Sequence, residues 1–223
     1  KMGFNVLDDP VTREKFWQMT AEIMTKYAHD PRVCIWDLYN EPGNCLRGEV
    51  TIPNLKEIFS IGWDIRPDQP LTASSLNPIK CPPVDKLAFE LSDITNYHLY
   101  GNYDINIKVL HELKKLGRPI VNSEWLHRIR HCDVKELFPL YFLEHVGCYC
   151  WGFVAGLYQT YEPWEGIWEM VANGTAPADW DLTRWQHDLM RPNYRPYDPK
   201  EIAIIKEYSK MADEDFASKS STP

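Results

Sequence analysis

The chain has 223 residues, of which 44% are hydrophobic and 25% charged, a balance typical of a folded globular protein and not of a disordered one. Its 24 basic and 32 acidic residues give a net charge of −8, which argues against nucleic acid or an anionic membrane surface as the partner. No apolar stretch approaches the roughly 20 residues of a membrane span. The length predicts a single domain, which we place over residues 1–212.

The N-terminal residues show no signal-peptide pattern, because Asp8 and Asp9 stand where an apolar core would begin. The chain starts with Lys1, so we expect further residues upstream, and a secreted and a cytoplasmic location both stay open. The oligomeric state is equally open. Six cysteines without a CxxC pair predict buried free thiols, in preference to a disulfide framework or a structural zinc site.

Helical and strand patterns alternate along the chain. Asp9-Pro10 is a helix-start pattern, and apolar residues recur at helical spacing from there to about His29. Further helices are predicted over residues 55–65, 84–91, 104–116 and 134–144, and from residue 198 onward. Short apolar runs predict strands over residues 33–39, 71–75, 93–99, 119–123 and 147–154. A long aromatic loop follows the last strand, and the polar residues 213–223 are predicted to form a disordered tail.

Strands that alternate with helices at this spacing predict an α/β fold built from βα units around a parallel sheet. Five strands allow either an open, flavodoxin-like sheet or the last five βα units (strands 4–8) of a (β/α)8 TIM barrel, which in full takes about 250 residues. The open sheet is disfavoured, because Asn40-Glu41-Pro42-Gly43-Asn44 stands where a glycine-rich phosphate loop would follow the first strand.

Two glutamates stand at the carboxyl ends of predicted strands, where parallel α/β proteins place their chemistry. Glu41 closes the first predicted strand and Glu124 closes the fourth. One glutamate at such a position is usually a solvated surface charge. Two at matching ends, three strands apart, indicate a paired-carboxylate site, since the curvature of a barrel would bring them face to face.

Asn40-Glu41-Pro42 after an apolar strand resembles the acid/base motif of clan A glycoside hydrolases, a superfamily of (β/α)8 enzymes with cellulases, mannanases and many β-glycosidases. In that superfamily the Asn-Glu pair ends strand four and a second glutamate ends strand seven, the separation found between Glu41 and Glu124. His98 and Tyr100 match a His-x-Tyr that strand six often carries, and Trp151 matches a sugar-stacking tryptophan on the last strand. The match covers about residues 33–154 and is strongest to the cellulase-type, family 5 branch.

The resemblance implies a retaining β-glycoside hydrolase that cleaves β-linked glycans or oligosaccharides of the cellulase, mannanase or xylanase kind by double displacement. Glu124 would be the nucleophile and Glu41 the acid/base. Four further residues would serve the substrate: Asn40 would bind the sugar 2-hydroxyl, Tyr100 would orient Glu124, His98 would contact the substrate or Glu41, and Trp151 would stack on a sugar. No metal or organic cofactor is implied. Weaker candidates for sugar platforms are Trp125, Trp164 and Trp168.

The sequence also departs from the superfamily, because the first three strands of the barrel have no counterpart in it. We therefore expect the chain to be the C-terminal portion of a longer enzyme, with little or no activity alone. The departure leaves one alternative open, a non-catalytic carbohydrate-binding protein or an inactive fragment that keeps the glycosidase pocket.

Overall fold

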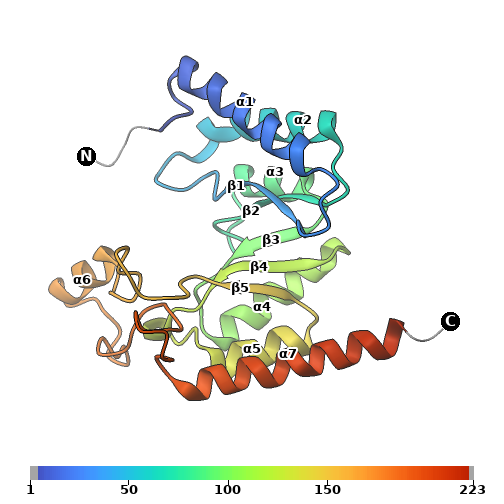
Figure 1. Cartoon of the computed structure of the whole chain (residues 1–223). Coiled ribbons are helices and arrows are strands. Elements are labelled where there is room, and N and C mark those ends of the chain that lie inside the picture. The colour runs from blue at the N-terminus through green and yellow to red at the C-terminus, as the bar shows by residue number, and fades with distance from the viewer. Residues whose placement is uncertain (1–4, 221–223) are drawn as a thin grey trace. The chain divides into compact units, whose positions relative to one another are not determined.

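Helices and parallel strands alternate along the chain, as the sequence predicts (Figure 1). The structure, a computed structural model, describes residues 5–220. The residues divide into two units, which we call unit 1 (up to His98) and unit 2 (from Leu99 onward). None of the helices within residues 5–220 has both the length and the apolar character that a membrane crossing requires.

Unit 1 is built around short parallel strands. Its elements are α1 (Pro10–Tyr27), β1 (Trp36–Asn40), the 3-10 helix η1 (Gly48–Thr51), α2 (Ile52–Ile65), β2 (Leu71–Ser74), α3 (Pro83–Leu91) and β3 (Thr95–His98). β1 pairs with β2 in parallel, with Trp36 opposite Leu71 and Asn40 opposite Ser74. A parallel bridge between Ser75 and Tyr97 connects the end of β2 to β3. The predicted βα order and parallel pairing are therefore confirmed in this unit.

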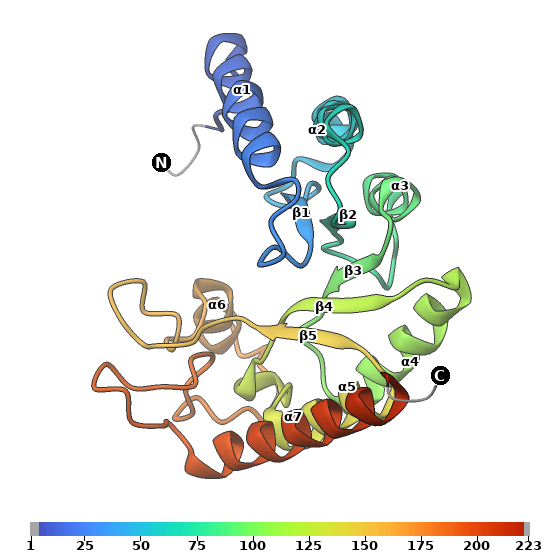
Figure 2. The same ribbon diagram turned by 45° about the vertical axis from the view of Figure 1, so that its right-hand side comes forward.

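The core of unit 1 lies between its helices and its strands. α1 and α2 lie on the same side of β1 and β2 in both ribbon views (Figure 2). The apolar face of α2 buries Leu55, Ile58 and Phe59 in one cluster with Leu71 of β2. At Gly62 a Cβ atom would lie only 2.8 Å from Leu71 Cδ1, so a glycine lets α2 approach the sheet. This packing holds β1 in place and with it the residues that follow the strand.

Unit 2 repeats the pattern with a second parallel pair. Its elements are α4 (Tyr103–Leu113), the 3-10 helices η2 (Lys114–Leu116) and η3 (Arg128–Arg130), β4 (Ile120–Trp125), α5 (Val134–Leu143), β5 (Gly147–Cys150), α6 (Glu165–Ala172) and α7 (Pro199–Ser220). β4 and β5 pair in parallel from Val121 opposite Gly147 to Trp125 opposite Cys150. The register shifts between Asn122 and Trp125, so β4 is irregular at the position of Glu124. Such irregularities re-aim side chains and are common beside active sites.

The helices of unit 2 bury one side of its sheet. Trp125 is 1% exposed and packs edge-on against Tyr141 of α5 at a ring-centroid distance of 5.2 Å. α5 and α7 lie side by side (Figures 1 and 2), and the Phe142 ring meets the Tyr208 ring edge-on at 5.4 Å. The buried position of Trp125 rules it out as a sugar platform in this structure.

Several predicted boundaries differ from those of the structure. β1 begins at Trp36 and not at residue 33, and β5 ends at Cys150 because the chain turns away at Gly152, whose φ is +84°. The predicted aromatic loop contains a helix, α6, that the sequence pattern did not show. Cys34 and Cys45 are exposed, so the prediction that the cysteines are buried is wrong for these two, although all six are free thiols.

The predicted disordered tail is wrong for residues 213–220, which are the last turns of α7. Exposed ion pairs one turn apart support this helix, between Lys210 and Glu214 and between Lys219 and Asp215. A polar stretch can therefore stay helical without burying an apolar face. Residues 221–223 lie outside the described part of the chain. The closed barrel and the boundary of the domain at residue 212 stay predictions.

Candidate active site

Glu41 follows the last residue of β1 and has an unusual backbone conformation. Its φ is +46°, in the left-handed region that non-glycine residues seldom adopt, and it directly precedes Pro42. Its N–H donates to the carbonyl of Ser74 at 3.1 Å, which ties this turn to β2. Strained residues of this kind cluster at functional sites, where the surrounding structure holds them in place.

The Glu41 carboxylate is buried among polar partners in unit 1. Its side chain is 9% exposed, and Oε1 lies 2.7 Å from Nδ1 of His98, the last residue of β3. The Asn44 side-chain amide donates to the other oxygen, Oε2. Asn40, Glu41 and His98 therefore all lie at the carboxyl ends of the strands of unit 1, and Asn40 itself is exposed. The resemblance implies that His98 contacts either the substrate or Glu41, and the structure shows the contact with Glu41.

A second acidic group of unit 1 lies on β1. Asp37 of β1 accepts a hydrogen bond from the Asn96 side-chain amide of β3 at 3.0 Å. Burial raises the pKa of Asp37, and the Asn96 hydrogen bond opposes that rise. This pair joins β1 to β3, which fits a structural role for Asp37.

Glu124 lies near the carboxyl end of β4 in unit 2. The Tyr100 hydroxyl donates to its Oε2 at 2.7 Å, and the backbone N–H of Leu99 donates to its carbonyl at 3.2 Å. Trp151, directly after β5, donates its N–H to the Trp125 carbonyl at 2.9 Å and is 43% exposed. The structure therefore brings Tyr100, Glu124 and Trp151 to neighbouring strand ends of unit 2.

Three ring side chains surround Tyr100. Its ring centroid lies 6.0 Å from that of His127, 5.1 Å from Trp164 and 5.5 Å from His187. His127 and His187 are fully buried. We call these three residues the Tyr100 cage. Because the cage closes around the ring, it limits the positions from which the Tyr100 hydroxyl can reach Glu124.

The two histidines of the cage are uncharged at neutral pH. Burial lowers the pKa of His127 to about 2, and the nearby Arg130 charge adds to the effect. Burial also lowers the pKa of His187 to about 4. Gln186 Nε2 lies 2.8 Å from His187 Nε2 and must donate to it, so His187 carries its proton on Nδ1 and donates it to the Leu126 carbonyl. Leu126, with a φ of +81°, is thereby fixed two residues after Glu124.

The cage predicts a pH-dependent stability. The unfolded chain binds protons on both histidines below a pH of about 6.5, whereas the folded chain resists protonation until the pH reaches about 4 at His187. The contribution of the two neutral histidines to the free energy of unfolding is therefore fully present above pH 6.5. Below that pH it falls by up to about 1.4 kcal/mol per pH unit for each histidine. Urea unfolding at pH 7, 6, 5 and 4 measures this slope.

His187→Gln should make the dependence of the unfolding free energy on pH shallower. His29→Asn, at an exposed histidine, is the control and should leave the slope as it is. An unchanged slope in His187→Gln would contradict the conclusion that His187 is buried without charge.

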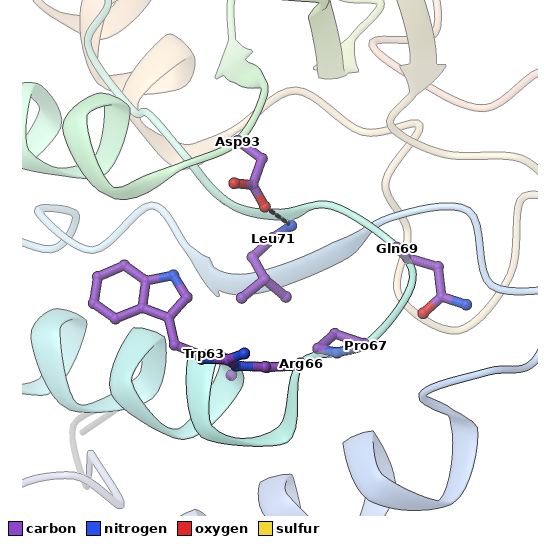
Figure 3. Close-up of a pocket in the computed structure, with 7 residues that line it drawn as sticks. Trp63, Arg66, Pro67, Gln69, Leu71 and Asp93 are labelled. Atoms are coloured by element: carbon purple, nitrogen blue, oxygen red, sulfur yellow. Dashed lines mark hydrogen bonds between the residues drawn. The ribbon is translucent and has the colours of Figure 1, made fainter.

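A pocket at the other ends of the strands of unit 1 does not belong to this site. It has a volume of about 350 Å³ and lies at the start of β2, between Trp63, Arg66 and Asp93. Figure 3 shows the Asp93 carboxylate directed at the backbone of Leu71, whose N–H donates to it at 2.7 Å. Asp93 also donates its own N–H to the Leu71 carbonyl at 2.8 Å. Parallel α/β proteins place their chemistry at the carboxyl ends of the strands. We therefore assign the residues at this amino end a role in stabilising the fold and not in catalysis.

Sequence reasoning named Trp164 only as a weak sugar platform and did not identify His127 or His187. No motif connects these residues, because they come from three separate loops that only the fold brings together. Trp168 is 47% exposed on α6. Within residues 5–220, neither unit by itself gathers three side chains that could ligate one metal ion.

Solved structures with a similar fold are glycoside hydrolases. β-Glucuronidase from Ruminococcus gnavus matches with a TM-score of 0.58 at 17% identity, over 94% of this chain and 37% of its own. β-D-Glucuronidase from Dictyoglomus thermophilum matches with a TM-score of 0.60 at 14% identity, over 91% and 36%. Xylanase 10B from Thermotoga maritima matches with a TM-score of 0.54 at 16% identity, over 91% and 68%. No protein-family model and no curated protein matches the sequence.

These similarities show the fold. The chain has the α/β fold found in glycoside hydrolases, with parallel strands and helices in the predicted order. The matched glucuronidases and xylanase do not support the family 5 branch over other branches. The chain spans about 37% of the length of the R. gnavus enzyme.

Proposed function

We propose that this chain carries the catalytic residues of a retaining β-glycoside hydrolase that acts on β-linked glycans or oligosaccharides. The observation that carries the proposal is the hydrogen bond of 2.7 Å from the Tyr100 hydroxyl to Glu124. A hydroxyl that donates to a carboxylate stabilises its ionised form. An ionised, oriented carboxylate at the end of a strand is what a glycosidase nucleophile requires.

In the first step Glu124 attacks the anomeric carbon and forms a covalent glycosyl-enzyme, while Glu41 donates a proton to the departing glycosidic oxygen. In the second step Glu41 removes a proton from water, and the resulting hydroxide releases the sugar from Glu124. Retention requires the two carboxyl groups to be about 5–5.5 Å apart. That both glutamates stand at carboxyl ends of parallel strands supports the pairing.

The acid/base role of Glu41 is supported by its surroundings. The Glu41 side chain is 9% exposed and lies beside His98, so its carboxyl group is shielded from bulk water. The His98 ring and the Asn44 amide hold its two oxygens in fixed directions. Two further residues are proposed to bind the substrate. Asn40 would hydrogen-bond the sugar 2-hydroxyl, and Trp151 would stack on the face of a sugar ring.

Trapping of the covalent intermediate in the full-length protein tests the proposal. A 2-deoxy-2-fluoro β-glycoside with a good leaving group forms the glycosyl-enzyme quickly and releases it slowly, because the fluorine destabilises both oxocarbenium-like transition states. We expect mass spectrometry of a peptide digest to find the label on Glu124. Proton NMR of the first product from an aryl β-glycoside should show the β-anomer. A label on another residue, or an α-anomer as the first product, would contradict the assignment.

A non-catalytic carbohydrate-binding role is the second candidate. Calorimetric titration of the full-length protein with β-linked oligosaccharides separates the two candidates. Binding without any hydrolysis or labelling would favour the second.

A further inference from the structure

An arginine beside the Tyr100 cage carries a charge that the proposed reaction does not use. Arg130 ends η3, and its backbone N–H donates to the His127 carbonyl at 2.9 Å. Its guanidinium carbon lies 5.3 Å from the ring centroid of Trp164, a member of the cage, and 5.7 Å from that of Trp180. Such cation–π contacts hold a guanidinium in place without neutralising its charge. All of these residues belong to unit 2.

No acidic side chain of the described chain compensates the charge of Arg130. Arg128, in the same 3-10 helix, pairs with Glu201, whereas Arg130 has no ion pair within residues 5–220. Burial lowers the pKa of the Arg130 guanidinium, and no carboxylate of the described residues offsets this shift. A cation that has lost part of its water without gaining an anion is costly. The surroundings of Arg130 therefore favour an added negative charge.

The polar groups around Arg130 are hydrogen-bond donors that lack acceptors. Its Nε is buried and has no hydrogen-bond partner among residues 5–220, and the same holds for both ring nitrogens of the fully buried His127. A neutral histidine carries one N–H, so this ring adds a further donor. The terminal amino groups of Arg130, Nη1 and Nη2, make no hydrogen bond within the described chain and are not among its buried polar atoms. They are therefore open to a ligand that brings acceptors.

The loop that presents Arg130 is closed before any ligand binds. The His127 N–H donates to the Cys132 carbonyl at 2.7 Å, and the Cys132 N–H donates to the His127 carbonyl at 3.2 Å. Trp164 is held as well, since its backbone N–H donates to the side-chain oxygen of the buried Gln186 at 2.9 Å. A preformed site loses less entropy when a ligand binds.

We propose that Arg130 is an oxyanion-binding site, which takes a carboxylate, sulfate or phosphate group through its two terminal amino groups. A planar guanidinium presents these N–H groups as a fork that matches two oxygens of one such group. A neutral ligand would accept the same hydrogen bonds but would leave the charge without compensation. The oxyanion can be a free ion or a group carried by a sugar, and the experiment below separates these two sources.

The site adjoins the candidate active site, because the Trp164 ring contacts both Tyr100 and Arg130. The inference nevertheless goes beyond the proposed function and does not depend on it. Binding of an oxyanion can be measured whether or not the protein hydrolyses a glycoside.

Calorimetry of the full-length protein tests the inference with four probes: sulfate, acetate, glucose 6-sulfate and glucose. Sodium chloride keeps the ionic strength constant, so that screening of charges does not change between titrations. The variants are Arg130→Gln, which removes the charge, and Arg130→Lys, which keeps the charge but not the fork. Arg191→Gln is the matched control, because Arg191 also lies over two aromatic rings, those of Trp185 and Tyr197, but is exposed to water.

We expect sulfate or glucose 6-sulfate to bind with a Kd of about 1 mM or less. Arg130→Gln should weaken this binding at least about tenfold, because charge-assisted hydrogen bonds are lost. Arg130→Lys should weaken it less, and Arg191→Gln should leave it unchanged. The affinity for glucose, which carries no charge, should be the same in Arg130→Gln and in the unaltered protein.

Equal affinities for sulfate and glucose 6-sulfate would assign the site to a free ion, and tighter binding of glucose 6-sulfate would assign it to an anionic sugar; both results support the inference. No binding of any of the three anions, or equal weakening by Arg191→Gln and Arg130→Gln, would overturn it. Circular dichroism shows whether each variant is folded. If Arg130→Gln does not fold, Arg130→Lys decides, and sulfate binding as tight as in the unaltered protein would overturn the inference.

Discussion

In the full-length protein, we expect Glu124→Gln to lower kcat for the hydrolysis of an aryl β-glycoside by at least about 10⁴-fold, since loss of a catalytic nucleophile removes the covalent route altogether. Glutamine has nearly the same shape as glutamate. Its side-chain oxygen can still accept the hydrogen bond that the Tyr100 hydroxyl donates to Glu124 Oε2 at 2.7 Å. The loss therefore reports the missing carboxylate and not a disturbed fold. Initial rates with a chromogenic β-glycoside, checked against a circular dichroism spectrum of the variant, measure it.

Two variants complete this experiment. Glu41→Gln should lose about 10²–10⁴-fold, the usual contribution of an acid/base group, and the loss should be smaller for a substrate whose leaving group needs no protonation. Glu112→Gln, at an exposed glutamate on α4 that pairs with Lys115, is the control and should retain full activity. Residual activity of Glu124→Gln equal to that of the control would remove Glu124 from the mechanism.

The second large effect is expected on stability, from the ion pair between Arg128 and Glu201. Arg128 is fully buried, and its guanidinium donates to both carboxylate oxygens of Glu201, Nε to Oε1 at 2.8 Å and Nη2 to Oε2 at 2.6 Å. It also donates to the carbonyls of Trp185, His187 and Asp188. One side chain thus fixes the start of α7 and the segment that carries His187 of the Tyr100 cage.

Arg128→Met should lower the free energy of unfolding by about 3–5 kcal/mol, because it leaves the Glu201 charge buried without its partner. The double variant Arg128→Met, Glu201→Met should be less destabilised than the sum of the two single variants. Urea unfolding followed by tryptophan fluorescence measures all three. Lys210→Ala, which breaks the exposed pair with Glu214, serves as the control and should lower the free energy of unfolding by no more than about 0.5 kcal/mol. A change in Arg128→Met as small as in the control would show that the network does not support the fold.

Much of the fold could be predicted because local patterns and tertiary packing agree. Asp9 accepts hydrogen bonds from the backbone N–H groups of Val11 and Thr12 at the start of α1, as the Asp-Pro pattern predicts. β2 is buried at all four positions, as expected in a parallel sheet, whereas β1 and β5 are only partly buried. The C-terminal turns of α7 were missed because they are polar. α6 was missed because it has only eight residues and no side chain caps its start.

Some residues of the candidate site could also be predicted from the sequence, and others could not. A motif that lies within a few residues, such as Asn40-Glu41-Pro42, is visible in the sequence, and so are single residues at strand ends, such as Glu124 and Trp151. The Tyr100 cage was not visible, because His127, Trp164 and His187 approach one another only through loops of irregular structure. Loop conformation depends on contacts such as those of Arg128, which no local pattern encodes.

The amino-acid order alone determined the alternation of helices and strands and the two glutamates at strand ends, since hydrophobic periodicity and chain punctuation are local properties. Only the tertiary structure decided which side chains hold those glutamates, that His127 and His187 are buried without charge, and that Arg130 lies over two tryptophan rings. These features depend on burial and on distances of a few ångströms between distant parts of the chain. The free energy that sets a pKa or leaves a donor without an acceptor arises only when the chain is packed.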